Sequence, residues 1–266
     1  MKLELVGAVF ALTMVVGAAQ ASTIVVTPPS GTPSATSWGV LPGEQSAGSS
    51  IGITGTAPRS GNGSIEMIGD RTRFQLGIQY ATGRTDLMAL SAVTGLAFDW
   101  RIAADATAGY NPDETPALRL LVQDGIQRSE LIWEGAYNGT YGNTTRDTWY
   151  SSTFNDNFYQ YQAGQGVTLS GGAQVNKTLS QWIASNYDSS AYVSGVSVGD
   201  GSGFSPGYHA FADNVTLGTT GGNTTYNFEL ASPGVPEPAT WGLMVMGFGG
   251  LGAILRRRRG SIALAA

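Results

Sequence analysis

The chain has 266 residues, of which 38 are glycine, one is histidine, none is cysteine and only 12% are charged. The lack of cysteine excludes disulfide bonds, zinc knuckles, iron–sulfur clusters and thiol nucleophiles, and a single histidine excludes a His-rich metal site. The net charge of −5 and the pI of about 4.8 provide no general basic surface for phosphates, so nucleic acid is not an expected partner.

The first 21 residues have the pattern of a secretory signal peptide. Lys2 precedes an apolar run from Leu5 to Val16, and Ala19-Gln20-Ala21 supplies the small residues that signal peptidase recognises. We place the cleavage between Ala21 and Ser22. The mature, exported chain would then begin at Ser22.

Residues 22–64 are rich in Pro, Gly, Ser and Thr, and we expect them to form loops and the first strands. From residue 65 to residue 230, apolar and polar residues alternate with the period of two that is typical of half-buried strands. One run places Leu96, Phe98, Trp100 and Ile102 on one face. A second run covers residues 118–122 and ends at an Asp124-Gly125 turn, and a helical period occurs only at residues 178–185.

These elements predict an all-β fold, an antiparallel β-sandwich of the jelly-roll or lectin type. Residues 22–235 suffice for one sizeable β domain or two small ones. They contain nine basic and seventeen acidic residues. This excess of negative charge predicts that the exported part repels anionic polysaccharide at low salt unless divalent cations bridge the two.

Aromatic residues are concentrated between residues 133 and 161. Flat rings with polar edges can stack on sugars, but the same residue types also fill the cores of β-sandwiches. We assign Trp133 to the core. We predict glycan contact for Trp149, Tyr150 or Tyr159, because they lie in Asn-, Ser- and Gly-rich sequence that is typical of exposed functional loops.

Two pairs of acidic residues are candidates for a glycosidase couple, whose carboxyl groups lie about 5–10 Å apart across a cleft. Asp113 and Glu114 are neighbours in the chain, and Glu130 and Glu134 would lie about 13 Å apart along a strand. Neither pair predicts the required geometry, and the Glu-x-Asp-x-Glu signature of sandwich glycosidases is absent. We therefore predict solvated charges, no catalytic residue and no enzymatic activity.

Two residues near the end of the domain remain to be assigned. His209 has no Gly-x-Ser-x-Gly motif and no second histidine with it, so we assign it a structural role. Asp213 has the parity of Phe211, Val215 and Leu217, and a regular strand would direct its carboxylate to the core, where an unpaired charge is costly. Its partner would be an arginine or a structural Ca²⁺ ion, which takes carboxylate and backbone oxygens.

Residues 231–266 form a C-terminal region with three consecutive parts. Prolines hold the segment Val235-Pro236-Glu237-Pro238-Ala239 extended. A membrane span follows at residues 240–255, and its apolar run Gly242–Leu255 would be about 21 Å long as a helix, shorter than the ~30 Å hydrocarbon core. Arg256, Arg257, Arg258 and Arg259 then form a positive cluster that we expect on the cytoplasmic side.

This order of a Pro-Glu-Pro motif, a short glycine-bearing span and an arginine cluster resembles the PEP-CTERM sorting domain over residues 235–259. The extension Gly260–Ala266 departs from the family, which typically stops sooner after the arginines. The resemblance implies a Gram-negative bacterial protein that Sec exports and that an exosortase, a membrane cysteine protease, cuts near Pro236-Glu237-Pro238. It also implies transient residence in the inner membrane and a destination at the cell surface or in the extracellular matrix, alongside exopolysaccharide and biofilm systems.

The ectodomain is similar to a recurrent group of PEP-CTERM β-sandwiches of unknown function, which look like lectin-type and carbohydrate-binding jelly rolls. This similarity implies an architecture rather than an activity. It rests on five segments that occur in the same order, Pro58–Ser64, Phe98–Trp100, Pro116–Leu120, Ile132–Gly139 and Phe211–Gly218.

We therefore expect an exported, exosortase-processed and non-enzymatic protein of the cell surface or matrix that contacts a glycan through aromatic loops. Two alternatives stay open. One is a hydrolase or lyase that acts on exopolysaccharide. The other is an ice- or surface-adhesion protein, although the regular Thr-x-Thr arrays of that class are missing.

Overall fold

The computed structural model describes residues 20–28, 30–40, 43, 45–80, 83–107, 114–138, 140–201 and 207–231, together with Met246 and Phe248. The chain divides into two units, Met1–Leu230 and Ala231–Ala266. The predicted signal peptide up to residue 19, the motif at residues 235–239 and Arg256–Arg259 lie outside the described residues, as does nearly all of the predicted span at 240–255. Among the described residues, no helix has the length and apolarity to cross a membrane.

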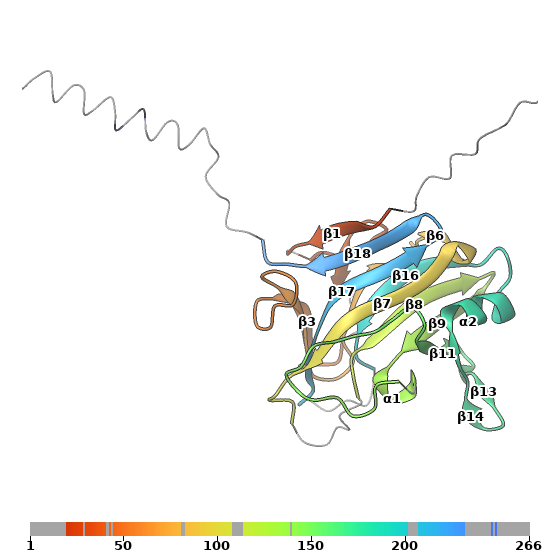
Figure 1. The fold of residues 1–266 in the computed structure, drawn as a ribbon. Coiled ribbons are helices and arrows are strands. Elements are labelled where there is room, and N and C mark those ends of the chain that lie inside the picture. The colour runs from red at the N-terminus through yellow and green to blue at the C-terminus, as the bar shows by residue number, and fades with distance from the viewer. Residues whose placement is uncertain are drawn as a thin grey trace, which may run out of the picture. The chain divides into compact units, whose positions relative to one another are not determined.

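In its described residues the ectodomain contains two large sheets, A and B, and a separate two-stranded sheet of β13 (Leu169–Ser170) and β14 (Ala173–Gln174) (Figure 1). Apart from the parallel pair β1–β18, the strand pairs described in them are antiparallel. Sheet A contains β1 (Ser22–Val26), β18 (Gly222–Phe228), β17 (His209–Thr219), β4 (Ser64–Ile68) and β3 (Ser50–Thr54), with β7 (Val93–Ile102) on β17 and β10 (Tyr150–Ser151) on β7.

Sheet B is the larger sheet. Its strands are, in order, β12 (Gly166–Val167), β11 (Asn157–Gln162), β9 (Gln127–Trp133), β8 (Ala117–Asp124), β16 (Tyr192–Gly199), β5 (Arg73–Gly77) and β2 (Trp38–Val40). In addition, β15 (Asn176–Thr178) pairs with β11, β6 (Met88–Ala89) pairs with β16, and β13 (Leu169–Ser170) forms a hairpin with β14 (Ala173–Gln174). A short 3₁₀ helix, η1 (Leu90–Ala92), connects β6 to β7.

Alternate residues of both sheets form one apolar core. Leu96, Phe98 and Trp100 of β7 pack in the same cluster as Trp133 of β9, and the ring centroids of Trp100 and Trp133 lie 4.7 Å apart. The predicted alternation along β7 and the predicted all-β, antiparallel fold are therefore confirmed.

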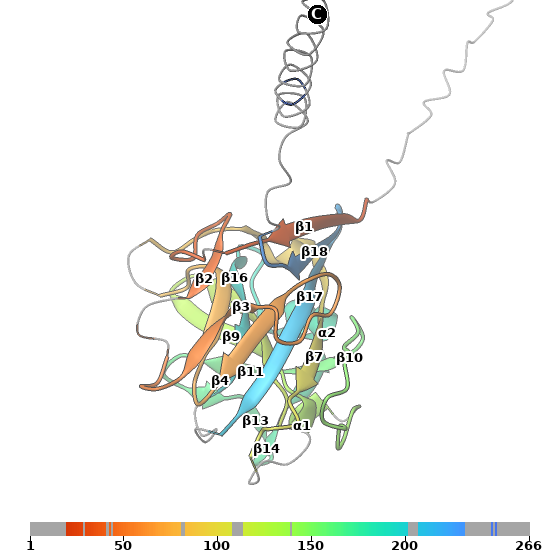
Figure 2. The ribbon, with the colours of Figure 1, turned by 90° about the vertical axis from the view of Figure 1, so that its left-hand side faces the viewer.

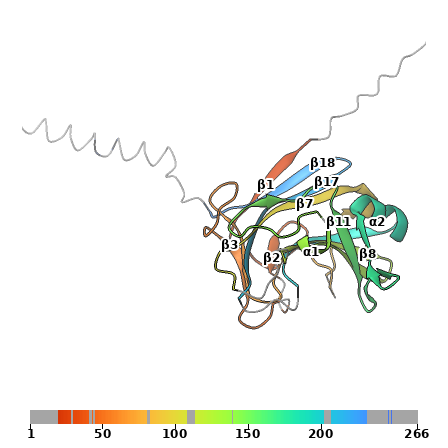
Figure 3. The same cartoon turned by 60° about the horizontal axis from the view of Figure 1, so that its bottom comes forward.

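Two further local predictions are also confirmed. β8 and β9 form a hairpin in which Asp124 pairs with Gln127, and Gly125 in the turn has a φ of 54°. The helix α2 (Leu179–Asn186) lies where the helical period occurs, and Thr178 and Gln181 cap its first turn reciprocally. The Trp182 indole of α2 donates a hydrogen bond to the Phe158 carbonyl of β11 at 2.8 Å, which fixes the helix at this side of the sandwich (Figure 3).

Along one of its edges, β17 pairs with two different strands in succession. His209–Ala212 pair with β4, and Val215–Thr219 pair with β18, while β7 lies along the other edge (Figure 2). At the changeover Asn214 has a φ of 50°, and the register with β7 shifts between Asp213 and Thr216. The strand thus contains a β-bulge.

The bulge overturns the expected direction of Asp213. Ala212 and Val215 both belong to the central core, whereas Phe211 packs in a separate cluster and Asp213 lies opposite Asp99. An extra residue changes the phase of the alternation, so Asp213 shares the outer face of sheet A with Phe211. Its side chain is nevertheless fully buried.

Asp213 and Glu229 supply hydrogen-bond acceptors where β18 ends and β4 begins. Asp213 Oδ1 accepts hydrogen bonds from the backbone N–H groups of Phe228 at 3.0 Å and of Asn214 at 2.7 Å. Glu229 Oε2 accepts one from Gly63 N at 2.9 Å and one from Asn62 N. The two carboxylates therefore satisfy N–H groups at a break in the strand pairing.

Candidate functional site

A cavity of about 860 Å³ lies on the face of sheet B that is turned away from the core. On its strands, core residues such as Leu118, Leu131 and Phe158 alternate with residues that line the cavity. The cavity extends across the sheet from β11 to β5. Its wall includes Tyr159 and Tyr161 of β11, Arg128 and Glu130 of β9, Arg119 of β8 and Arg73 of β5.

The helix α1 (Gly135–Asn138) extends one end of this cavity. It follows β9 directly and lies beside β11 (Figure 3). Tyr137 of α1 lines the cavity and contacts the Tyr159 ring edge-on, with ring centroids 5.5 Å apart. Tyr137 is 48% exposed and Tyr161 is 38% exposed, so this end presents aromatic surface to solvent.

Glu130 is the centre of an ion network in the cavity. Arg73 donates to both of its carboxylate oxygens at 3.3 and 3.2 Å, Tyr80 donates to Oε1 at 3.0 Å, and Arg119 Nε lies 3.7 Å from Oε2. Burial by itself would raise the pKa of Glu130. The charges of Arg73 and Arg119 and the hydrogen bonds outweigh burial and hold the pKa below its ordinary value.

Glu134 has the opposite electrostatic environment. Burial raises its pKa, and the attraction of Arg119 and a hydrogen bond with Tyr159 do not cancel this effect, while the nearby Glu114 adds to it. The same surroundings raise the pKa of the Tyr159 hydroxyl. These surroundings shift the titration of Glu134 towards the neutral acid, the opposite of the shift at Glu130.

The expectation that these two acids are solvated is therefore wrong for Glu130, which is only 5% exposed. Glu134 is half-buried. Both acids line the same cavity, and they lie four residues apart in the chain. Arg119 is a charged neighbour of both. The other pair cannot be compared, because Asp113 lies outside the described residues.

The far end of the cavity is formed by the start of β5 and the end of β16. Asp200 Oδ1 accepts hydrogen bonds from the hydroxyl of Thr72 at 2.6 Å and from its backbone N–H. Burial raises the pKa of Asp200 to about 6. Arg71 lines the cavity here with a backbone φ of 54°, which removes its residue from the regular strand.

The three aromatic residues predicted to contact a glycan lie in different places. Tyr159 lines the cavity of sheet B. Trp149 packs instead against Ala57, Ala103 and Phe211 on the outer face of sheet A, and Tyr150 stacks on the Trp100 ring with centroids 5.6 Å apart. Only Tyr159 of this set can therefore contribute to the site in sheet B.

The structure provides no arginine partner for Asp213 among the described residues, and Oδ2 has no hydrogen-bond partner there. Within the described part of the chain, no group of three or more His, Cys, Asp or Glu side chains is arranged to hold a metal ion. The Ca²⁺ ion predicted at Asp213 stays a prediction.

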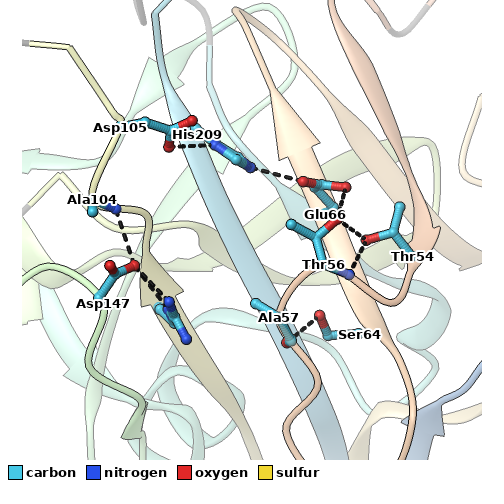
Figure 4. A network of polar contacts seen from close by, with 10 residues as sticks. Thr54, Thr56, Ala57, Ser64, Glu66, Ala104, Asp105, Asp147 and His209 are labelled. Carbon is cyan, nitrogen blue, oxygen red and sulfur yellow. Dashed lines mark hydrogen bonds and ion pairs between the residues drawn. The ribbon is translucent and has the colours of Figure 1, made fainter.

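His209 lies in a separate polar network on the outer face of sheet A (Figure 4). Its Nε2 lies 2.9 Å from Glu66 Oε1, and its Nδ1 lies 2.6 Å from Asp105 Oδ1. Nearby, Asp147 Oδ1 accepts hydrogen bonds from Arg101 Nη2 at 2.6 Å and from Ala104 N at 3.0 Å (Figure 4). These contacts connect β17, β4 and the loop after β7, which is the structural role expected for His209.

Sequence reasoning did not identify Arg73, Tyr80 and Arg119 as site residues. Arg119 carried a signal, since it stands between Leu118 and Leu120 in an apolar strand and a buried cation needs a carboxylate. No such signal identified Arg73, which lies 57 residues from Glu130 in the chain.

Residues 234–259 match the family model of the PEP-CTERM protein-sorting motif. This match confirms the sorting region recognised from the proline motif and the arginine cluster. No curated protein matches the chain.

Proposed function

We propose, on the premise that the motif at residues 234–259 makes this chain an exosortase-targeted exported surface protein, that its ectodomain binds a polysaccharide segment in the cavity of sheet B without cleaving it. The observation that carries this proposal is the arrangement of the cavity. Exposed rings of Tyr137 and Tyr161 stand at one end, and fixed charged and polar side chains form the floor.

The dimensions of the cavity favour an extended ligand. From β11 to β5 there are four inter-strand steps of ~4.8 Å, or about 19 Å in all. Tyrosine faces supply apolar contact for sugar rings, and arginine, carboxyl and hydroxyl groups supply directional hydrogen bonds for their substituents. A chain of sugars satisfies both kinds of surface along this length.

The state of Glu130 supports binding rather than cleavage. Both of its oxygens already accept hydrogen bonds from Arg73, and Tyr80 occupies Oε1 as well. A carboxylate held in this way is poorly available as a nucleophile or as a base for water.

A hydrolase or lyase is the second candidate, and one observation favours it. Glu130 and Glu134 line the same cavity, and their pKa values are shifted in opposite directions, as in acid and base pairs. Incubation of the full-length protein with its host's polysaccharide distinguishes the two. We expect no new reducing or unsaturated ends, and product formation that is lost in Glu134→Gln would establish the enzyme instead.

Binding is tested on the aromatic end of the cavity. We expect the purified full-length chain to bind polysaccharides on a glycan array, and Tyr161→Ala to weaken that binding, because its partly exposed ring lines the cavity. Trp149→Phe on sheet A is the matched control and should bind like the parent. Loss of binding in the Trp149 variant alone would move the glycan site to sheet A.

The route to the surface forms part of the same proposal. Signal peptidase would cut between Ala21 and Ser22, and exosortase would release the ectodomain from the inner membrane to the cell surface or matrix of a Gram-negative cell, in an exopolysaccharide or biofilm setting. Ser22 is the first residue of β1, so this cut leaves the first strand whole. Glu237→Ala, or deletion of Arg256–Arg259, should trap an unprocessed form in the inner membrane. Unchanged release of both variants, followed by immunoblot of cell fractions, would contradict the sorting route.

A further inference from the structure

The cavity of sheet B differs in charge from the rest of the ectodomain. Residues 22–235 contain nine basic and seventeen acidic residues. In the described part of the chain, four of the nine basic residues line the cavity, namely Arg71, Arg73, Arg119 and Arg128, and four of the acidic residues do so, namely Glu114, Glu130, Glu134 and Asp200. An acidic domain thus collects nearly half of its cations at one place.

Not all of these cations are neutralised by the acids beside them. Arg73 and Arg119 share one carboxylate, that of Glu130. The Arg128 guanidinium stacks over the Tyr80 ring at 4.0 Å and forms no ion pair or hydrogen bond with the described residues. The Arg71 guanidinium has no such partner either, and Nη1 of Arg119 is buried without a hydrogen-bond partner.

Among the described residues, no acid of the cavity forms an ion pair with Arg71 or Arg128. The carboxylate of Glu130 is already engaged by Arg73 and Arg119. The guanidinium groups of Arg71 and Arg128 are therefore the ones available to pair with an anionic ligand. Arg71 directly precedes β5 and Arg128 lies in β9, which are three inter-strand steps or about 14 Å apart.

We propose that the polysaccharide bound in this cavity is acidic and carries carboxylate groups at intervals along its chain. The inference rests on the proposed function. Guanidinium groups pair with carboxylates through two parallel hydrogen bonds, and two separated arginines match charges that repeat along a polymer better than one compact anion. The overall acidity of the ectodomain predicts repulsion of such a polymer, but the cavity has as many basic as acidic residues, whereas the rest of residues 22–235 has five basic and thirteen acidic residues.

The test compares each acidic polymer with its own uncharged form. The purified full-length chain is titrated with alginate, polygalacturonate and hyaluronate, and with the carboxyl-reduced form of each, at low and at high salt. We expect tighter binding of the carboxylated member of at least one pair, and this preference should diminish at high salt.

Variants locate the preference in the cavity. Arg128→Gln should reduce affinity for the carboxylated polymer about tenfold or more, because the charge-assisted hydrogen bonds of the guanidinium group are lost. It should weaken binding of the reduced polymer by a much smaller factor, because only the carboxylated form can pair with the guanidinium charge. Arg84→Gln is the matched control, because Arg84 is exposed and does not line the cavity.

The outcomes separate the two proposals. Equal affinity within every pair, or preference for the reduced form, overturns the acidic ligand and leaves polysaccharide binding in place. A preference that Arg84→Gln abolishes as strongly as Arg128→Gln also overturns it, because the charge would then act from outside the cavity. Failure to bind any polymer of either kind overturns the proposed function itself.

Discussion

The outer faces of the two sheets contain similar charged residues but pair them differently. On sheet A, Arg59 lies 3.0 Å from Asp99, Arg101 lies 2.6 Å from Asp147, and His209 lies between Glu66 and Asp105. On sheet B, Arg73 and Arg119 share Glu130, while Arg71 and Arg128 have no carboxylate partner among the described residues.

On sheet A, these ion pairs connect neighbouring elements of the fold. On sheet B, the described residues leave two arginines without an ion pair. The segment between β9 and β11 adds β10 to sheet A and places Phe154 against Gly95 and Gly218, where a Cβ would meet its ring. The outer face of sheet A is thus covered at this point, whereas that of sheet B has an open cavity. A net charge averaged over the chain cannot show such a contrast.

The largest expected effect tests the network of sheet B. Glu130→Gln keeps the size of the side chain but leaves Arg73 and Arg119 without their carboxylate in a buried place. We expect a loss of about 3–5 kcal/mol in the free energy of unfolding. Urea denaturation measures it, and a loss below 1 kcal/mol would mean that solvent already screens this network as it screens the exposed Arg101–Asp147 pair of sheet A.

Asp213 is the exception on sheet A, because it forms no ion pair with any cation among the described residues, and we expect an intermediate effect from its substitution. Burial raises its pKa to about 6 from an ordinary 3.8. The folded state therefore holds the proton more tightly than the unfolded state. The resulting stabilisation is complete below about pH 4 and is lost as the pH rises through about 6, by up to ~3 kcal/mol.

Asp213→Asn removes the charge and keeps Oδ1 as an acceptor for Phe228 N and Asn214 N. We expect a higher Tm than that of the parent at pH 8 and little difference at about pH 4. The pKa of Asp200 is also raised, but Asp200 is present in the parent and in the Asp213 variant, so its effect on Tm cancels when the two are compared. A parent whose Tm falls on addition of chelator, with a variant that is less stable and insensitive to chelator, would instead establish the predicted Ca²⁺ ion.

The smallest effect is expected at an exposed pair of sheet A. Asp147 has a side chain that is 46% exposed, and its ion pair with Arg101 is screened by water. Asp147→Asn should therefore reduce the free energy of unfolding by less than about 1 kcal/mol and leave polysaccharide affinity unchanged. A loss as large as that of Glu130→Gln in the same urea experiment would remove the distinction between the two faces.

Local patterns predicted much of the fold. The alternation of Leu96, Phe98 and Trp100 identifies the core face of β7, and Asp124-Gly125 identifies the turn between β8 and β9. The direction of Asp213 could not be predicted in this way. A bulge changes the phase of a strand by one residue, and the left-handed conformation of Asn214 leaves no mark in a pattern of polar and apolar residues.

The three aromatic residues predicted to contact a glycan lie on different sheets. Tyr159 lines the cavity of sheet B, so its glycan contact stays a prediction, but Trp149 and Tyr150, close to it in the chain, belong to sheet A. The prediction grouped the three by composition. Their separation depends on β10 and β11 joining different sheets, which neighbouring sequence does not specify.

The sequence by itself determined the sorting motif at residues 234–259 and the β-rich character of the ectodomain. Both are encoded by residues that are close together in the chain, a linear motif in one case and a period of two in the other. Only the tertiary structure decided which charges are paired and which are left over. Arg73, Arg119 and Glu130 come from three strands, and their pairing depends on the strand order that brings β5, β8 and β9 to one face.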